Sequence, residues 1–552
     1  MTTSALRSRI ARCAAAARSA LLLAIATVLT ACAGLPRLPP SAPTAAIADY
    51  AQTPIAAITQ KVLPSESGDG RSGFRLQPYG PNSFATRIEL TKLATRSLDV
   101  QYYLLQGDNT GRALMRALRD AAARGVRVRL LIDDLYTAGE DQPLLGLASY
   151  PNVEVRLFNP FPAGRGNDVT RFISSGFDFS RVNRRMHNKL FIADNAAAVA
   201  GGRNMADEYV MNAAGSNFID MDTFVAGPLV RDLSHAFDVY WNSDAVFPVR
   251  SIARSGATDA ELQQAFERST ASAAPPLASE IPADGRPRNP SDGEPDQLPH
   301  DLVPMLNLPF ELASGNLSPL ILAKARVVFD PVSKIDAFND RQDAARGTVT
   351  EAVIAWFKTA RSSIKMVSPY FVPSDSAVMS LADAKQAGIT VELITNSLAS
   401  TDEAWVYVGY EAHIKALLKA GVRVWELSPS LSVKRHKLGI FGHRTGALHM
   451  KNAIVDHKQV FLGSMNLDQR SALLNTELGL VIDSPEMAHQ LDGFGDAGSS
   501  YQLRLSADGQ NVEWLERNDD GTSTVYDVPP ETTAWQRLWL RLIGPFIPER
   551  EL

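Results

Sequence analysis

The sequence predicts an α/β protein made of two similar lobes, because strands and helices alternate along the chain and one unit occurs twice. Residues 96–133 and 361–396 each begin with Arg-Ser and a short strand, continue into a helix that ends at a glycine, and enter a second strand. Strands that alternate with helices of this length are typical of a β-sheet flanked by helices. A unit that occurs twice implies two lobes related by a pseudo-twofold axis.

The first copy shows each element of this unit. Strands are predicted over residues 98–103 and 126–132. The helix between them ends at Gly125, and its counterpart in the second copy ends at Gly388; glycine is the usual residue at such a stop. One face of the first helix is apolar and is therefore expected to be buried: Leu114, Ala117, Leu118 and Ala121.

Composition shifts divide the rest of the chain. The segment between the repeats begins with a capping-box pair, Thr258 and Glu261, and then carries seven prolines from Pro275 to Pro299. Such a stretch cannot sustain a helix or a sheet, so we expect an exposed linker, with a lid over the site as the alternative. The predicted parts are a signal sequence (1–31), a tether (32–73), a first lobe (74–250), a Pro-rich insertion (251–315), a second lobe (316–495), and a C-terminal hairpin and amphipathic helix (496–552).

The N-terminus carries an export pattern. Four arginines precede an apolar stretch, Ala20 to Leu29, that is too short to span a membrane comfortably. The stretch ends in Leu29-Thr30-Ala31-Cys32, which resembles the lipobox of bacterial lipoproteins and implies lipidation of Cys32. An ordinary signal peptide and an uncleaved anchor are the alternatives. We therefore expect a lipoprotein of the bacterial cell envelope that faces the periplasm.

The C-terminal helix and the net charge of the chain indicate which kinds of partner the protein can bind. The helix starts near Thr533, and its apolar residues share one face, with arginines beside it: Trp535, Leu538, Trp539, Leu542 and Phe546. This composition suits a membrane surface, and packing onto the protein's own core is the alternative. The formal net charge of -5 provides no broad basic surface, so no nucleic-acid partner is expected.

Each lobe holds one copy of a five-residue pattern, in segments 182–209 and 444–471. The spacing is identical in both: His187, Lys189, Asp194, Gly201 and Asn204, then His449, Lys451, Asp456, Gly463 and Asn466. Each residue type occurs by chance at about one position in twenty, so two such matches are not accidental. The pattern is the H-x-K-x4-D-x6-G-x-x-N signature, and the chain is identified by it as a member of the phospholipase D superfamily.

The alternation of side chains along a strand predicts which way each of these residues faces. Residues i and i+2 of a strand face the same way, so His187 and Lys189 point together, as do His449 and Lys451. The aspartates, Asp194 and Asp456, lie seven residues after their histidines at the following turn. By alternation they face away, and we expect them to stabilise the turn.

Two further carboxylates are candidates for orienting the histidines. Glu477 resembles the family's orienting glutamate, and aligning the prolines that follow places Asp220 opposite it in the first lobe, with Asp222 as the alternate. A carboxylate on the far ring nitrogen fixes the tautomer of a catalytic imidazole. The copies differ mildly at one motif position, which is Gly202 in the first copy and Ser464 in the second.

These residue types suit the cleavage of a phosphodiester. One histidine can attack phosphorus and form a phosphohistidine, while the other protonates the leaving alcohol and then deprotonates the acceptor. Lys189 and Lys451 supply positive charge, and Asn204 and Asn466 supply neutral donors. Both histidines must reach one phosphorus, so we expect a single site at the seam of the lobes. Resemblance to the superfamily makes His187 the expected nucleophile and His449 the acid/base.

Within the superfamily the chain is most similar to bacterial cardiolipin synthases of the C-type branch, through residues 183–189, 201–209 and 466–471. The resemblance implies transfer of a phosphatidyl group to a phosphatidylglycerol-type acceptor at a membrane surface. Phosphatidylethanolamine is a second candidate substrate, and no metal or other cofactor is implied. The alternatives are a phospholipase D hydrolase, a nuclease of the same fold, and an inactive lipid-binding lipoprotein. The acidic chain counts against the nuclease, and the two intact motifs count against the inactive protein.

Overall fold

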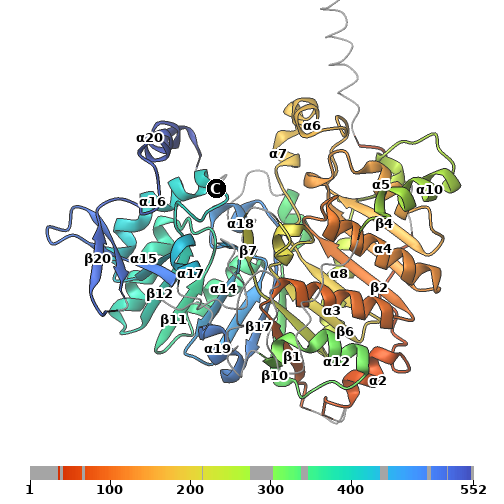
Figure 1. Ribbon diagram of the computed structural model, residues 1–552, viewed down its shortest axis with the longest axis horizontal. Coiled ribbons are helices and arrows are strands. Elements are labelled where there is room, and N and C mark those ends of the chain that lie inside the picture. Colours follow the sequence, from red (N-terminus) through yellow and green to blue (C-terminus); the bar gives the residue numbers. More distant parts are fainter. Residues whose placement is uncertain are drawn as a thin grey trace, which may run out of the picture.

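The computed structural model shows two lobes side by side, formed by the two halves of the chain (Figure 1). It describes residues 35–37, 42–64, 69–213, 216–273, 303–336, 346–434, 446–493, 499–518 and 520–548. The N-terminal export segment with Cys32 and the Pro-rich centre of the insertion, with Pro275 to Pro299, lie outside these ranges. In the described part, no helix is both long and apolar enough to cross a membrane.

The first lobe is a mixed sheet with three parallel strands, β2, β3 and β4, at its centre. The other neighbours in the sheet are antiparallel. The strand order is β1 (Ser72–Gln77), β8 (Asp222–Ala226), β6 (Ala197–Gly201), β5 (Leu190–Ala193), β2 (Ser97–Tyr102), β3 (Arg127–Asp133), β4 (Val153–Phe158), β9 (Val246–Pro248).

The second lobe repeats this order strand for strand and extends it by a C-terminal hairpin. The order is β10 (Ile321–Phe329), β17 (Leu478–Asp483), β16 (Gln459–Gly463), β15 (Asn452–Val455), β11 (Ser363–Val367), β12 (Thr390–Asn396), β13 (Arg423–Leu427), β18 (Ser500–Leu505), β19 (Val512–Arg517), β20 (Ser523–Tyr526). The prediction of an α/β fold with two similar lobes is therefore confirmed.

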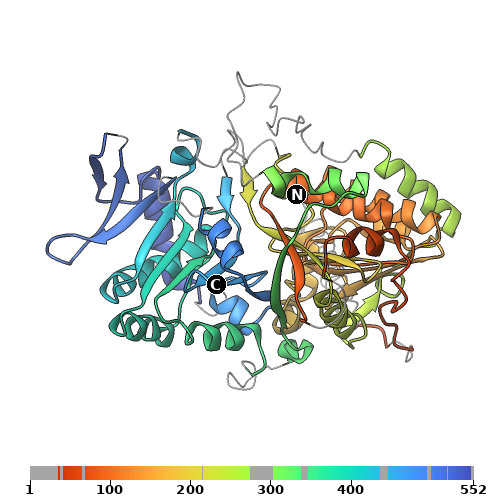
Figure 2. The same cartoon turned by 90° about the horizontal axis from the view of Figure 1, so that it is seen from below.

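The two sheets join edge to edge. Strands β1 and β10 pair antiparallel, from Ser72 opposite Ala323 to Phe74 opposite Ile321, and lie next to each other at the junction in Figure 2. In the described part of the chain this pairing makes one continuous sheet of 18 strands. Helices pack on its faces. The lobes are thus held in a fixed relation by backbone hydrogen bonds as well as by side-chain packing.

The predicted helix of the first repeat is α4 (Asn109–Ala123). Asp108 caps its first turn by accepting a hydrogen bond from the Gly111 amide, and Leu114, Leu118 and Ala121 are fully buried. The chain then turns through Gly125 at φ +96°, a conformation that glycine adopts without a steric penalty. The equivalent helix, α15 (Asp375–Gln386), is followed by Gly388 at φ +85°.

The predicted tether, residues 32–73, differs from the structure. Helix α2 (Pro54–Gln60) packs on the first lobe with Ile55 fully buried, and strand β1 already begins at Ser72. Upstream, the Thr44 amide donates to Asn242. The Pro, Ala and Ser content of the segment predicts a tether. The few branched apolar side chains of the segment are nevertheless enough to hold it on the lobe.

Both ends of the insertion, residues 251–315, also pack on the first lobe. Helix α10 (Asp259–Thr270) has the expected capping box, and its Phe266 is buried in the apolar core that includes α5 (Asp141–Leu147). Helix α12 (Leu308–Ser314) packs on α3 (Gly80–Leu93). The expected capping box is therefore present, and the linker interpretation applies to the stretch from Pro275 to Pro299, which lies outside the described residues.

Candidate active site

The ends of two equivalent strands hold the segments that lead into the histidines. Asp133, the last residue of β3, accepts hydrogen bonds from the Met186 amide at 2.7 Å and from Arg185 at 3.0 Å. In the second lobe Asn396, the last residue of β12, accepts from the Leu448 amide at 2.8 Å. His187 and His449 follow directly, at the C-terminal edge of the parallel strands.

Backbone pairing across the seam fixes the position of each histidine. The His187 amide donates to the Thr476 carbonyl at 2.8 Å, and the His449 amide donates to the Ile219 carbonyl at 2.7 Å. The second contact extends a short parallel pair between β7 (Asn217–Ile219) and β14 (Gly446–Leu448). Each histidine therefore lies beside the residue that precedes a carboxylate of the opposite lobe.

The two carboxylates consequently cross over. Glu477 of the second lobe lies 2.9 Å from Nδ1 of His187, and Asp220 of the first lobe lies 2.6 Å from Nδ1 of His449. A carboxylate at Nδ1 holds the proton on that nitrogen and leaves the lone pair on Nε2. Between the two residues left open in the sequence, Asp220 is the one that reaches a histidine. Asp222 instead pairs with two buried arginines, Arg87 and Arg203, each at 3.1 Å.

The difference between Gly202 and Ser464 matches the difference between the carboxylates. Ser464 donates a short hydrogen bond to Glu477. A Cβ atom at Gly202 would lie only 2.3 Å from Oδ1 of Asp220. Aspartate is one methylene shorter than glutamate, so its carboxylate stays close to the neighbouring backbone. Gly202 is therefore required by Asp220, and Ser464 fits Glu477.

Both lysines are buried beside the histidines. Lys189 donates to the His187 carbonyl at 2.7 Å, and Lys451 donates to the His449 carbonyl with its Nζ 2.9 Å from Nδ1 of the same histidine. Burial lowers the pKa of both lysines, and that of Lys451 falls to about 8 although the carboxylates of Asp220 and Glu477 oppose the shift. Both lysines thus lie in a site shielded from solvent, where burial disfavours their charged form and the carboxylates favour it.

The electrostatics link all four groups into one site. Burial is the main cause that lowers the pKa of both histidines, and the charges of both lysines lower the pKa of each histidine further. Burial also raises the pKa of Asp220, and that of Glu477 to about 7. These shifts favour a neutral imidazole, which is the form that can attack phosphorus or accept a proton.

Asp194 and Asp456 lie at the turns after the histidine strands and do not contact the histidines. Both have positive φ, 53° and 55°. Asp194 accepts hydrogen bonds from the amides of residues 95–97, and Asp456 accepts from the amides of residues 361–363. Burial raises the pKa of Asp456, but these donors outweigh it and hold the pKa at about 2. Each aspartate ties its hairpin to the start of the neighbouring strand.

The two motif asparagines have different surroundings. Asn204 donates to the Tyr209 hydroxyl at 2.9 Å. The side-chain oxygen of Asn466 is buried and, among the residues that the structure describes, has no hydrogen-bond partner. Of the two motif asparagines, Asn466 is the one whose side-chain oxygen is left without a partner in the described part of the chain.

Tyr209 and Tyr103 were not singled out from the sequence. The Tyr209 hydroxyl lies 3.3 Å from Nε2 of His449, and the Tyr103 ring packs edge-on against His187 with centroids 4.8 Å apart. Tyr209 occupies the position that Ser471 has in the second motif, where Ser471 donates to Glu477 at 2.8 Å. Aligning the two copies beyond their asparagines would have shown this difference.

No metal centre was expected. Within the described ranges, no group of three or more His, Cys, Asp or Glu side chains is placed to hold a metal ion.

Comparisons with known proteins point to one family. The family model described as cardiolipin synthase, PLD-like domain, matches residues 88–241 and 353–494. Cardiolipin synthase C of Escherichia coli (strain K12) is 36% identical over 469 residues, 84% of this chain and 92% of that protein. An uncharacterised protein of Helicobacter pylori (strain ATCC 700392 / 26695) is 28% identical over 91% of this chain and 93% of its own length.

Among solved structures, the fold is similar to that of phosphatidylserine synthase from Haemophilus influenzae Rd KW20. The TM-score is 0.53 at 14% identity, and the match covers 87% of this chain and 95% of that one. At this identity the likeness concerns the fold.

Proposed function

The chain belongs to the cardiolipin synthase family of phospholipase D-like, phospholipid-modifying enzymes, and from that premise we propose that it transfers a phosphatidyl group between two phospholipids through a phosphohistidine. The observation that carries the proposal is the crossed pair of carboxylate-bound histidines at the seam. Each histidine depends on the other lobe for its tautomer. Two separate active sites would not need a carboxylate from the opposite lobe. One shared site with two complementary histidines does need each lobe to supply a carboxylate to the histidine of the other.

In the first step, Nε2 of His187 attacks phosphorus and the bond to the headgroup alkoxide breaks. His449 enters this step as the imidazolium, the form that the bound phosphate anion and Asp220 favour, and its Nε2 proton goes to the alkoxide, which leaves as an alcohol. In the second step, His449 removes a proton from the acceptor hydroxyl, whose oxygen attacks phosphorus while the bond to His187 breaks. Both histidines return to their starting state. Lys189 and Lys451 balance the charge of the phosphoryl oxygens in both steps.

The surroundings of the two histidines support this order of roles. The Tyr209 hydroxyl at Nε2 of His449 is a partner that can hold a proton or an acceptor oxygen in place. Arg470 lies on the His187 side: its charge lowers the pKa of His187 after burial and both lysines, and its guanidinium donates to the Asn183 carbonyl at 2.9 Å. A cation there suits the phosphate that His187 carries.

Phosphatidylglycerol is the proposed acceptor, and phosphatidylethanolamine is the proposed second substrate. Asp402 and Glu403 lie at the second-lobe side of the site. The Asp402 carboxylate accepts from Tyr370 at 2.8 Å and is among the charges that oppose the burial-driven fall in the pKa of Lys451. Burial raises the pKa of Glu403 to about 7. Carboxylates at this position suit the ammonium of an ethanolamine headgroup.

We also propose that the protein is anchored to the bacterial envelope through lipid on Cys32 and faces the periplasm. The support is the sequence of the N-terminal segment, Leu29-Thr30-Ala31-Cys32, after its arginines and apolar stretch. The family relationship agrees with a protein that works at a bacterial membrane. The anchor would keep the enzyme at the surface that holds its substrates.

The test is incubation of the purified protein with labelled phosphatidylglycerol, with and without phosphatidylethanolamine, followed by lipid chromatography. We expect labelled cardiolipin, with more of it when phosphatidylethanolamine is present. A parallel assay with a metal chelator should give the same rate. Labelled phosphatidic acid as the sole product would show that the protein hydrolyses the phospholipid and does not transfer the phosphatidyl group to another lipid.

A further inference from the structure

We propose that the protein docks on a phospholipid bilayer through two apolar patches, one on each lobe, that flank the active site. The proposal rests on the proposed function, because long-chain lipids must reach His187 and His449 from a membrane. The helix patch comprises Trp535, Leu538, Trp539, Leu542 and Phe546. The arm patch comprises Val169, Phe172, Ile173 and Phe179.

The helix patch exists because α20 (Ala534–Ile543) is apolar on two faces and only one is covered. Leu540 points inward and is 6% exposed, and Gly544 lies against Val408 of α16 (Ala404–Lys419). The opposite face exposes residues at spacings of three and four, and Phe546 follows at 85% exposed. A helix that needed only to pack on α16 would have polar side chains there.

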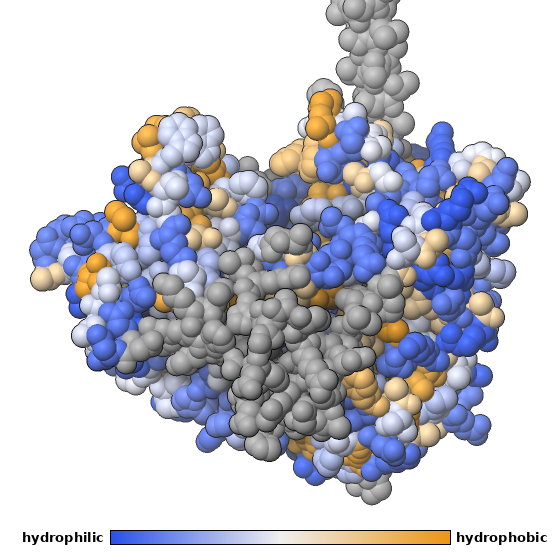
Figure 3. Space-filling model, viewed as in Figure 1, coloured by the Kyte–Doolittle hydropathy of each residue, from blue (hydrophilic) through white to orange (hydrophobic). Residues whose placement is uncertain are grey.

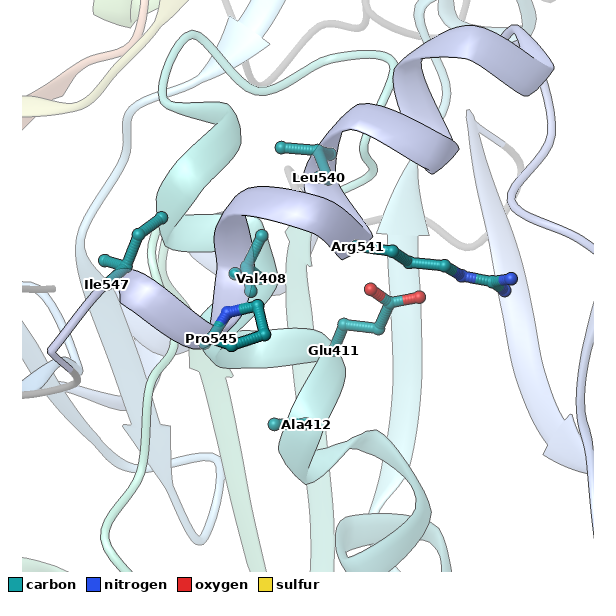
Figure 4. A pocket seen from close by; sticks show the side chains of 9 residues that line it. Val408, Glu411, Ala412, Leu540, Arg541, Pro545 and Ile547 are labelled. Carbon is teal, nitrogen blue, oxygen red and sulfur yellow. The ribbon is translucent and has the colours of Figure 1, made fainter.

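A groove separates part of α20 from α16, as Figure 4 shows. It is a cavity of about 460 Å³, with Val408, Pro545 and Ile547 at one end and Glu411 and Arg541 at the other. The groove contains none of the candidate catalytic residues. It leaves α20 raised above the lobe, with its outer face directed away from the protein.

The arm patch is apolar and exposed, yet firmly held. Helix α6 (Asp168–Ser174) carries Ile173, which is 76% exposed. The same helix is anchored by Arg171, which is fully buried and donates to the carbonyls of Asp134 at 2.6 Å and Leu135 at 2.9 Å. The exposed side chains are thus presented on a fixed support.

Short chains of contacts connect both patches to the site. Beside the arm patch, the exposed Tyr136 packs on Tyr103 at 5.3 Å, and Tyr103 packs on His187 at 4.8 Å. Beside the helix patch, Ile547 shares a small apolar cluster with Tyr370, whose hydroxyl binds Asp402. Figures 1 and 3 show α20 and α6 as two raised tips on the same side of the molecule, with apolar surface on both.

A bilayer fits these features better than a protein partner does. Nine of the 16 exposed large apolar side chains in the described part of the chain lie in the two patches. Tryptophan on the outer face, with Arg537 and Arg541 along its border, is typical of helices that lie in the interface of an anionic membrane. Two separate tips on one side can rest together on a flat surface.

The test measures activity of the full chain on two forms of one substrate. The variants are W535S/W539S for the helix patch and V169S/I173S for the arm patch. Each should lower turnover of phosphatidylglycerol in vesicles by about tenfold or more. Turnover of a short-chain phosphatidylglycerol dissolved as monomers should stay within about twofold, because the chemistry needs no bilayer. The control F310S removes a large apolar side chain that is 45% exposed from α12, away from the site, and should change neither rate.

Docking is also measured without turnover. Vesicles of phosphatidylglycerol and phosphatidylethanolamine with brominated acyl chains should quench the fluorescence of Trp535 and Trp539, and W535F/W539F should lose this quenching. Unchanged vesicle turnover in both patch variants, or no quenching of the wild type, overturns the docking proposal. A lipid-free dimer that W535S/W539S converts to a monomer also overturns it, because a second copy then covers the patch. Quenching without turnover of either substrate would retain docking and reject the proposed function.

Discussion

Nδ1 of His187 lies 2.9 Å from Oε2 of Glu477, although 290 residues separate them and they belong to different lobes. Asp220 and His449 make the reciprocal contact. The exchange follows from backbone pairing at the seam, where each histidine amide donates to the carbonyl that precedes the partner carboxylate. Neither lobe alone contains a complete histidine–carboxylate pair.

This crossing predicts distinct effects for the two carboxylates. Glu477→Gln should slow formation of the phosphohistidine on His187, and Asp220→Asn should slow both steps, because His449 acts first as acid and then as base. Each of these rates should fall by about 10²- to 10⁴-fold. Both replacements keep the shape of the side chain but remove the charge that stabilises the imidazolium. Rapid-quench measurement of the phosphoenzyme separates the two steps. Unchanged formation of the phosphoenzyme in Glu477→Gln, or unchanged transfer to the acceptor in Asp220→Asn, would contradict the assignment.

The histidine variants should differ in kind. His187→Ala should form no phosphoenzyme with any donor. His449→Ala should still form one slowly from a donor whose leaving group needs no proton, and should then stall, because no base activates the acceptor. Acid-labile label trapped in each variant is the measurement. Label on His449 in the His187→Ala protein would reverse the roles.

Gly202 and Asp220 should behave as a coupled pair. Gly202→Ser should lower activity by about tenfold or more, since its Cβ would fall 2.3 Å from the Asp220 carboxylate and displace it from His449. The double variant G202S/D220E reproduces the pairing of Ser464 with Glu477 and should recover part of the loss. Comparison of turnover in the single and double variants measures the coupling. Losses that simply add would show that the sites are independent.

We expect Lys451 to set an upper pH limit for the reaction. Burial lowers its pKa to about 8, so the folded enzyme loses this cation as pH rises through that value, and the rate should fall. Lys451→Arg keeps its charge at every pH of the assay and should remove the decline, even if its rate is lower at neutral pH. Single-turnover pH profiles of the two proteins test this. An unchanged decline in the arginine variant would assign the titration to another group.

The N-terminal segment gives a prediction that is independent of the site. Cys32→Ala should abolish metabolic labelling with fatty acid and leave an unprocessed precursor, because the proposed lipobox then lacks the residue that would be modified. Electrophoresis of labelled cells distinguishes precursor from product. Normal processing in the variant would remove the lipoprotein proposal.

Structural features that are set by residues close together along the chain could be predicted from the sequence alone. The repeated unit predicted two α/β lobes, and the spacing of each motif placed His187 beside Lys189 and put Asp194 at a turn. Helical periodicity identified both the buried face of α4 and the apolar stripe on α20. These features depend on neighbours along one strand or one helix, so they can be recognised without knowing how the lobes meet.

Features that are set by contacts between distant segments could be established only from the three-dimensional structure. The sequence left Asp220 and Asp222 open, and the structure separates them because β8 directs Asp222 to Arg87 and leaves Asp220 at the seam. The sequence also gave no sign that Tyr209 reaches His449, or that the segment around Ile55 would pack on the first lobe. The contacts of Asp220 and Tyr209 with His449 depend on the antiparallel pairing of β1 with β10 and the parallel pairing of β7 with β14, which fix how two similar lobes face each other.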